Sequence, residues 1–292
     1  MALAALFWSA GGVGVKSVEA SPLVIAGLRS FFAIPIMLAV VKGRKGPNAA
    51  SPYWTLRYRY SWIAAVAYAV MVIAFVFAAK YTTVASAIFI QYTGPIYVAV
   101  LSVPLLGERI SRGDLLAVCG CTFGMALFFR DDLDAGQRLG NIIAIVSSFG
   151  FAALPLALRY EQRALAAQSR SLSLSPTVAM ALGNALTFLV ALPEIVRHPP
   201  TRTHDWVVLA LLGTLQIGLP YVLYGAAVSK LKAIESSLVA MLEPIVSPLW
   251  AFLLFAEVPG KWARMGAVVI LLSLAVQAWL GRRGESARAS QV

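Results

Sequence analysis

Long apolar stretches alternate with short polar segments along the whole chain. An α-helix needs about 20 apolar residues to cross roughly 30 Å of hydrocarbon, and ten stretches come close to that length. We expect ten membrane-spanning helices, at residues 2–15, 23–41, 61–79, 84–106, 114–129, 140–158, 177–196, 206–228, 234–255 and 262–280. The connections average about nine residues, which is too short for a soluble domain. The pattern therefore predicts an all-α integral membrane protein.

Composition agrees with this pattern and excludes most soluble functions. Hydrophobic residues make up 60% of the 292 residues and charged residues 13%, against roughly 45–50% and about 25% in soluble domains. We therefore expect the lipid bilayer as the main partner. The net charge of +11 would suggest nucleic acid in a soluble protein, but basic loops of a membrane protein face anionic lipid headgroups. We expect no nucleic-acid partner.

The distribution of Lys and Arg between the loops predicts the orientation of the helices. Loops after even-numbered spans carry 15 of these residues and loops after odd-numbered spans carry 8, while Arg29 lies inside the second span. Cytoplasmic loops are enriched in Lys and Arg, so we expect both termini in the cytoplasm. The first stretch could instead be a signal peptide, but it has no basic leader.

An internal repeat appears when the chain is shifted by 149 residues against itself. Residues 91–108 then align with residues 240–257 without a gap, so that Pro95 meets Pro244 and Glu108 meets Glu257. We expect two halves, residues 1–133 and 134–292, of five spans each. Because five is odd, consecutive halves enter the bilayer in opposite orientations, which gives an inverted repeat. A chance match of two proline-bearing helices is the alternative.

These features resemble a known family. Ten spans in two fives, a helix of the form Pro-x12-Glu near the end of each half, and the sequence Gly107-Glu108-Arg109 are similar to the EamA-like members of the drug/metabolite transporter superfamily. The second half departs from the pattern, with Ala256-Glu257-Val258 in place of Gly-Glu-Arg. Chain length and aromatic content are similar to the YddG-type bacterial exporters of aromatic amino acids. The resemblance implies a multi-pass protein of the bacterial inner membrane.

A transporter of this plan binds its substrate near the membrane midplane, where interrupted helices expose polar backbone groups. Polar and aromatic residues on the apolar spans are candidate lining residues, and helix packing is their alternative role. The candidates are Trp8, Tyr68, Gln91, Tyr92, Ser148, Gln216, Tyr221, Tyr224 and Glu243. Proline inside a helix frees a carbonyl and kinks the chain, and glycine adds freedom. The candidate hinges are Gly94, Pro95, Pro155 and Pro244.

Charged residues at membrane depth are costly and call for a partner or a cavity. Glu243 has three possible roles: a partner for the helix start at Pro244, a proton-coupling site, or a contact for a substrate ammonium group. We favour the structural or substrate role, because one isolated acid does not make a relay. For Arg29 we expect snorkelling to the interface. For Glu108 and Glu257 we expect contacts with backbone donors or loop arginines.

Several chemical motifs are missing from the sequence. There is no Gly-x4-Gly-Lys-Ser/Thr loop, and the glycines at residues 11–14 have another spacing, so ATP is not expected as the direct energy source. The two histidines, His198 and His204, lie in one loop. We expect no catalytic residues, no metal and no cofactor.

We therefore expect a secondary active or facilitative transporter that moves small, partly apolar metabolites by alternating access. Aromatic amino acids, carried outward, are the favoured substrates, and a monomer is the simplest assembly. The alternatives are an intramembrane enzyme acting on a lipid or polyprenyl substrate, and a channel. An enzyme should show clustered acids or histidines at the interface, and a channel should show rings of like residues.

Overall fold

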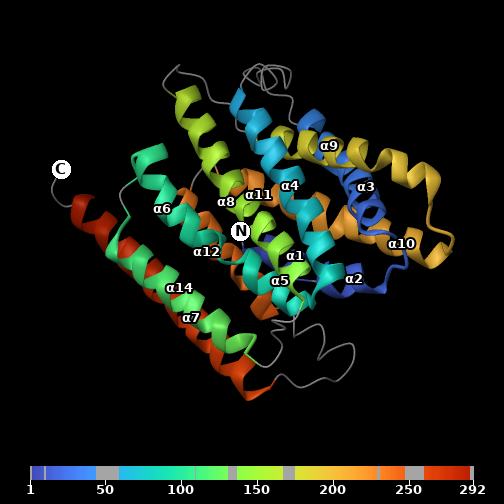
Figure 1. Cartoon of the computed structure of the whole chain (residues 1–292). Coiled ribbons are helices and arrows are strands. Elements are labelled where there is room, and N and C mark those ends of the chain that lie inside the picture. Colours follow the sequence, from blue (N-terminus) through green and yellow to red (C-terminus); the bar gives the residue numbers. More distant parts are fainter. Residues whose placement is uncertain are drawn as a thin grey trace.

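The computed structural model describes residues 2–9, 11–43, 59–108, 110–130, 137–166, 175–228, 231–246 and 260–289, and every element in these ranges is helical (Figure 1). The elements are α1 Ala2–Trp8, α2 Gly11–Ser17, α3 Pro22–Gly43, α4 Arg59–Tyr81, α5 Val84–Gln91, α6 Gly94–Leu106, α7 Arg112–Phe128, α8 Arg138–Ala166, α9 Ser175–Arg197, α10 Thr203–Leu211, the π-helical turn η2 Leu212–Gly218, α11 Leu219–Val228, α12 Ala233–Ala240 and α14 Lys261–Ala289.

Seven helical segments in the described ranges are long and apolar enough to cross a membrane. They are Pro22–Gly43, Arg59–Tyr81, Val84–Leu106, Arg138–Ala164, Pro176–Arg197, Thr203–Val228 and Lys261–Leu280. The prediction of an all-helical, multi-pass protein is confirmed at this level. Of the other three predicted spans, the first is divided into α1 and α2, the fifth is the 17-residue helix α7, and the ninth runs beyond residue 246 into residues that the structure does not describe.

The predicted fourth span is two helices, and the break between them follows from the local sequence. The Thr83 hydroxyl accepts a hydrogen bond from the Ser86 amide (3.0 Å) and caps the start of α5. At the far end, α5 stops at Gln91 and α6 begins at Gly94, with Pro95 in its first turn. Proline has no amide hydrogen but fits the first turn of a helix. Pro95 therefore starts a helix rather than kinking one.

The described part of the second half contains a matching break. Helix α12 has eight residues, as α5 does, and its first residue, Ala233, lies 149 positions after Val84. A turn at Met241 ends α12, and helical residues 242–246 follow, including Pro244. The starts of α7 and α14 are separated by the same 149 positions. The helix boundaries thus reproduce the spacing that the sequence repeat suggested.

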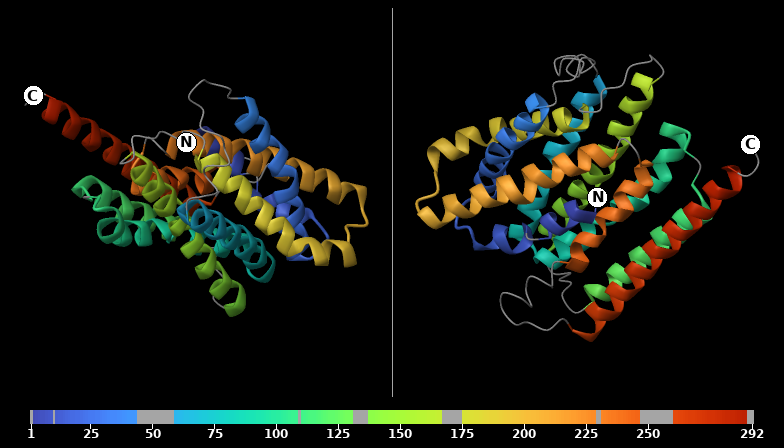
Figure 2. Two further views of the ribbon diagram at one scale, coloured as in Figure 1. Left: turned by 90° about the horizontal axis from the view of Figure 1, so that it is seen from above. Right: turned by 180° about the vertical axis from the view of Figure 1, so that it is seen from behind.

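Helices α7 and α14 form a pair at one edge of the molecule, as two views show (Figures 1 and 2). Their contact is close because glycines face each other. A Cβ atom added to Gly266 would lie 2.4 Å from the carbonyl oxygen of Gly124, and one added to Gly120 would lie 2.2 Å from the Ser273 hydroxyl. Small residues let two membrane helices bring their backbones together and gain van der Waals contact.

Helix α1 packs against η2, α11 and α12, and its residues Ala4 and Ala5 are completely buried. Helix α4 contacts α8 and α9, and α3 packs against α9 and η2. Many large apolar side chains point outward, for example Val196, Val100 and Leu116. Exposed large apolar side chains on so many of the long apolar helices are suited to lipid. Two cavities lie beside Trp8, the last residue of α1.

Candidate functional site

Two adjoining cavities lie next to α1. Both are lined by Trp8, Met71, Phe151 and Tyr221. The first is also lined by Arg29, Val72, Phe75, Gln91, Gln216, Ile217 and Glu243, so its wall carries both charges and amides. The second is also lined by Leu154, Pro155, Tyr224, Ser236, Ser237 and Ala240, and is largely apolar. We call these the polar cavity and the apolar cavity.

Neither cavity is large in this conformation. The polar cavity has a volume of about 60 Å³ and the apolar cavity about 20 Å³. One water molecule requires roughly 10–15 Å³ on this measure. The space therefore suits a few water molecules or one small chemical group, and the helices must separate to admit a whole metabolite.

Tyr92 and Glu243 connect the two helix breaks beside the polar cavity. The Tyr92 hydroxyl donates a hydrogen bond to Oε2 of Glu243 (2.7 Å) and lies 3.0 Å from the carbonyl oxygen of Ala240. Tyr92 follows α5 and Glu243 follows α12, so each break supplies one partner. Gly94 sits tightly against α8, because an added Cβ would be 2.5 Å from Cδ1 of Phe151. Displacement of either break would alter the cavity wall.

Gln91 lines the polar cavity, and a short chain of hydrogen bonds holds its side chain in place. Its amide nitrogen donates to the Ser147 hydroxyl (2.8 Å), which donates to the carbonyl oxygen of Met71 (2.9 Å). The neighbouring Ser148, which the sequence suggested, instead donates to the carbonyl oxygen of Ile145 within α8 (2.8 Å). The polar contact from α8 thus comes from Ser147, one residue earlier than expected.

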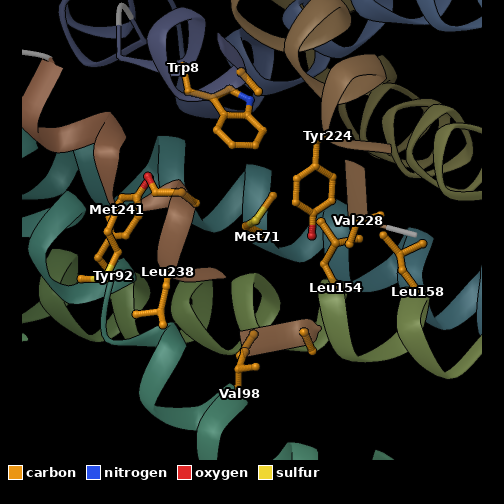
Figure 3. Packing of buried hydrophobic residues seen from close by; sticks show 14 of the residues in the cluster. Trp8, Met71, Tyr92, Val98, Leu154, Leu158, Tyr224, Val228, Leu238 and Met241 are labelled. Atoms are coloured by element: carbon orange, nitrogen blue, oxygen red, sulfur yellow. The ribbon is translucent and has the colours of Figure 1, made fainter. Parts of the chain in front are cut away.

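Aromatic rings surround the boundary between the two cavities. The Tyr221 ring centroid is 4.9 Å from that of Trp8 and 4.8 Å from that of Tyr68, and Tyr224 is 5.8 Å from Trp8. Figure 3 shows Trp8 pointing toward Met71, with the Tyr224 ring beside them and its hydroxyl directed toward Leu154. Tyr68 is fully buried and its hydroxyl donates to the Asn184 side chain (3.3 Å). Tyr68 thus packs edge-on against Tyr221 in the buried interior.

Arg29 lies in the cavity wall and not at the membrane interface, where the sequence placed it. Its side chain is 3% exposed and lines the polar cavity, so the expected snorkelling to the membrane interface is wrong. Within the described residues its Nε and Nη1 atoms have no hydrogen-bond partner. An arginine in the middle of an apolar span was the available signal, because ionisable residues at that depth are usually functional.

Gln216 lies on η2, beside Arg29 and Trp8. Its amide nitrogen donates to the carbonyl oxygen of Trp8 (3.3 Å), and its Oε1 atom has no partner among the described residues. Insertion of a π-helical turn widens a helix and is common at functional sites. The sequence identified Gln216 but contained no sign of the π-helical turn.

The candidate hinge prolines occupy different settings. Pro95 starts α6 and Pro244 lies in the short helical segment after α12. Pro155 lies inside α8, which continues to Ala166, and it lines the apolar cavity. Pro95 and Pro244 therefore lie near the starts of helical segments. There the chain can change direction without loss of hydrogen bonds inside a helix.

Glu108 holds one end of the bundle together. Its Oε1 atom accepts hydrogen bonds from Arg159 (3.0 Å) and Arg163 (2.9 Å), and its Oε2 atom accepts from the amide of Ala233 (3.3 Å) at the start of α12. The expectation for Glu108 is confirmed, although the arginines belong to α8 rather than to a loop. Glu257 and Arg109 lie outside the described residues.

The opposite end carries a second set of ionic contacts. Helix α4 runs from the first end, where Ser61 donates to Glu161 of α8, to this end, where Lys80 donates to the carbonyl oxygen of Val18 (2.8 Å). Arg202 pairs with Glu19 (2.5 Å), and that hydrogen bond raises the pKa of the Arg202 guanidinium. Within the described ranges, no group of three His, Cys, Asp or Glu side chains could hold a metal ion.

Comparisons with known proteins agree with this architecture. The model of the EamA-like transporter family matches two segments, residues 1–130 and 138–278. An uncharacterized transporter of Archaeoglobus fulgidus is 27% identical over 208 residues, which is 71% of this chain and 72% of that protein. A solved crystal structure superposes with a TM-score of 0.77 over 97% of this chain and 96% of that chain. Its sequence identity of 17% supports a shared fold only.

Proposed function

The chain belongs to the EamA-like transporter family, and on that premise we propose that it is a secondary active or facilitative transporter of small, partly apolar metabolites that works by alternating access. Membrane transport of small molecules is the function of the family. The coupling, the substrate class and the mechanism are our proposals.

We propose ten spans arranged as two inverted five-helix repeats, residues 1–133 and 134–292. Two observations support this plan. The breaks after α5 and α12 and the starts of α7 and α14 obey one spacing of 149 residues. The family model matches the chain in two segments whose boundary, between residues 130 and 138, falls at the proposed junction.

Alternating access would move the two helix breaks relative to each other. The hydrogen bond between Tyr92 and Glu243 connects the breaks at the cavity, while Glu108 ties α6 to α8 and α12 at the end that we place in the cytoplasm. Opening toward the cytoplasm would break the Glu108 contacts. Gly94, Pro95, Pro155 and Pro244 are the proposed hinges.

The observation that carries the substrate proposal is the combination of aromatic rings with polar groups around one pair of cavities. Trp8, Tyr221 and Tyr224 present ring faces and edges that suit an aromatic side chain, and Gln91, Gln216 and Glu243 present polar atoms. We propose aromatic amino acids as substrates, carried outward across a bacterial inner membrane with both termini in the cytoplasm. A monomer contains the whole of this site.

Uptake into proteoliposomes tests the proposal. Purified protein should accelerate the equilibration of radiolabelled L-phenylalanine, L-tyrosine or L-tryptophan in a saturable manner, relative to protein-free liposomes. The same vesicles with and without a pH gradient test the coupling, since flux that does not depend on the gradient would mean facilitated diffusion. Absence of flux for all three amino acids would overturn the substrate proposal. The comparisons do not favour an intramembrane enzyme.

A further inference from the structure

We propose that Arg29 binds the carboxylate of the transported molecule and that Glu243 faces its ammonium group, so that the cavity selects zwitterionic amino acids over related molecules with a single charge. This inference rests on the proposed transport function and specifies the substrate class of the same site.

Arg29 has hydrogen-bond donors that no described residue uses. A guanidinium stays protonated in proteins and has five N–H donors. Only 3% of the Arg29 surface is exposed, and its Nε and Nη1 atoms have no hydrogen-bond partner among the described residues. Burying N–H donors of a charged group without acceptors is unfavourable. An anionic group that enters the polar cavity would supply the missing acceptors, and a carboxylate matches the planar fork of the guanidinium.

The wall of the polar cavity carries one basic and one acidic side chain. Arg29 and Glu243 line the same cavity, but within the described part of the chain neither forms an ion pair. Their side chains thus share the cavity without a direct ionic contact. A single anion would pair with Arg29 but would meet the Glu243 carboxylate, and a single cation would meet the opposite difficulty. A zwitterion satisfies both groups and keeps the cavity neutral.

Two neutral polar side chains, Trp8 and Gln216, line the same cavity. The indole nitrogen of Trp8 and the Oε1 atom of Gln216 have no partner among the described residues. An indole N–H can donate to a carboxylate and an amide oxygen can accept from an ammonium group. One donor and one acceptor are therefore available for the same two ends of the ligand.

The backbone around Arg29 fixes its position. A Cβ atom added to Gly213 of η2 would lie 2.5 Å from the carbonyl oxygen of Arg29 and 2.5 Å from Cβ of Phe32, so α3 and η2 are in direct contact. The apolar cavity, with Leu154 and Tyr224, adjoins the polar cavity and would receive the side chain of the amino acid.

The experiment measures binding of four matched ligands to the detergent-purified, wild-type protein: L-phenylalanine, L-phenylalaninamide, 3-phenylpropionate and phenethylamine. Ligand-induced thermal stabilisation reports the affinity, because binding to the folded state raises apparent stability. We expect L-phenylalanine to bind on the order of tenfold or more tightly than each of the other three. Equal binding of phenylalaninamide or of 3-phenylpropionate would overturn the proposal. This part needs no variant.

Variants then test the assignment of the two charges. Arg29→Gln should lower the affinity for L-phenylalanine on the order of tenfold and should not lower that for phenylalaninamide, whose positive charge no longer meets the guanidinium. Arg29→Lys should recover part of the loss. Glu243→Gln should give the converse pattern, with a loss of affinity for L-phenylalanine and no loss for 3-phenylpropionate. Arg138→Gln, at an exposed position, is the matched control. An equal loss for all ligands, or no loss, would contradict the assignment.

Failure of this inference can be distinguished from failure of the proposed function. If the wild-type protein transports singly charged or neutral aromatic molecules as well as amino acids in proteoliposomes, the transport function stands and the zwitterion inference is wrong. If it transports none of them, the proposed substrate class itself has failed.

Discussion

The hydroxyl of Tyr92 donates a hydrogen bond to the carboxylate of Glu243 at 2.7 Å, and this contact joins residues 151 positions apart in the chain. Each residue follows a short helix of eight residues, α5 or α12, at the point where the helix breaks. The two interrupted segments thus meet beside the polar cavity. We expect a movement at either break to disturb this partly buried polar contact.

Replacement of Tyr92 by phenylalanine should destabilise the protein and weaken transport. The change removes one hydrogen bond to a carboxylate, which is worth about 1.5–3 kcal/mol when the acceptor is charged, while the ring stays in place. Thermal unfolding in detergent and initial uptake rates measure the effect. Tyr97→Phe is the control, since Tyr97 stacks on Phe149 with centroids 4.6 Å apart and keeps that contact. Equal behaviour of the two variants would contradict the structural role of Tyr92.

Glu108→Gln should favour the conformation that is open at the Glu108 end. The neutral amide loses the charge that attracts Arg159 and Arg163, although it can still accept from Ala233. We expect a cysteine at position 237, in the apolar cavity wall, to react severalfold faster with an impermeant thiol reagent applied from that side. The background carries Cys119→Ser and Cys121→Ala, because both native cysteines are free thiols.

The matched control for this charge removal is Glu194→Gln. Glu194 pairs with His198 at the opposite end of the bundle, so its neutralisation should leave labelling from the Glu108 end unchanged. A Glu108→Gln protein that labels no faster than this control would show that the bridge does not hold the bundle closed.

Gly11→Ala should lower substrate affinity without unfolding the protein. The added Cβ would lie 2.5 Å from Nε2 of Gln216, so that side chain must move and lose its hydrogen bond to Trp8. Because Gln216 is a flexible side chain, we expect a stability change below about 1 kcal/mol and a severalfold loss of affinity for L-phenylalanine. Gly43→Ala, whose added Cβ meets nothing within 4 Å, should behave as the wild type. Unchanged affinity in Gly11→Ala would remove Gln216 from the site.

Gly266→Ala should destabilise the α7–α14 pair. The added Cβ would be 2.4 Å from the carbonyl oxygen of Gly124 and 2.5 Å from the amide of Phe128, and backbone atoms cannot move aside as a side chain can. Overpacking of this kind typically costs about 1–3 kcal/mol. Thermal unfolding should show a lower midpoint than for Gly260→Ala, where the added Cβ meets nothing within 4 Å. Identical midpoints would mean that the pair tolerates separation.

Much of the fold follows from the sequence, because lipid imposes a simple rule. Backbone groups in hydrocarbon must find partners within their own segment, so long apolar stretches become helices. The expected span 84–106 ends at the residues where α5 begins and α6 ends. Pro95 also marked the break between them. The division of the first stretch after Trp8 and the π-helical turn at Leu212–Gly218 carry no such mark in the sequence.

The site was harder to predict, because it depends on helix rotation. A rotation error of one residue exchanges Ser147, which accepts from Gln91, for Ser148, which bonds within its own helix. Hydrophobic periodicity does not settle that rotation in α8, which is packed on several sides. Arg29 was misplaced because its long side chain could reach an interface. Its burial beside η2 depends on a contact with a segment that is about 185 residues away in sequence.

Thiol modification at the cavity tests most directly the central claim that the transported molecule passes through the space where the two helix breaks meet. The protein with a cysteine at position 237, in the background without native cysteines, is reconstituted and assayed for L-phenylalanine exchange before and after treatment with a bulky thiol reagent. The account predicts that modification abolishes exchange and that excess L-phenylalanine slows the modification. Complete modification with undiminished exchange would contradict it.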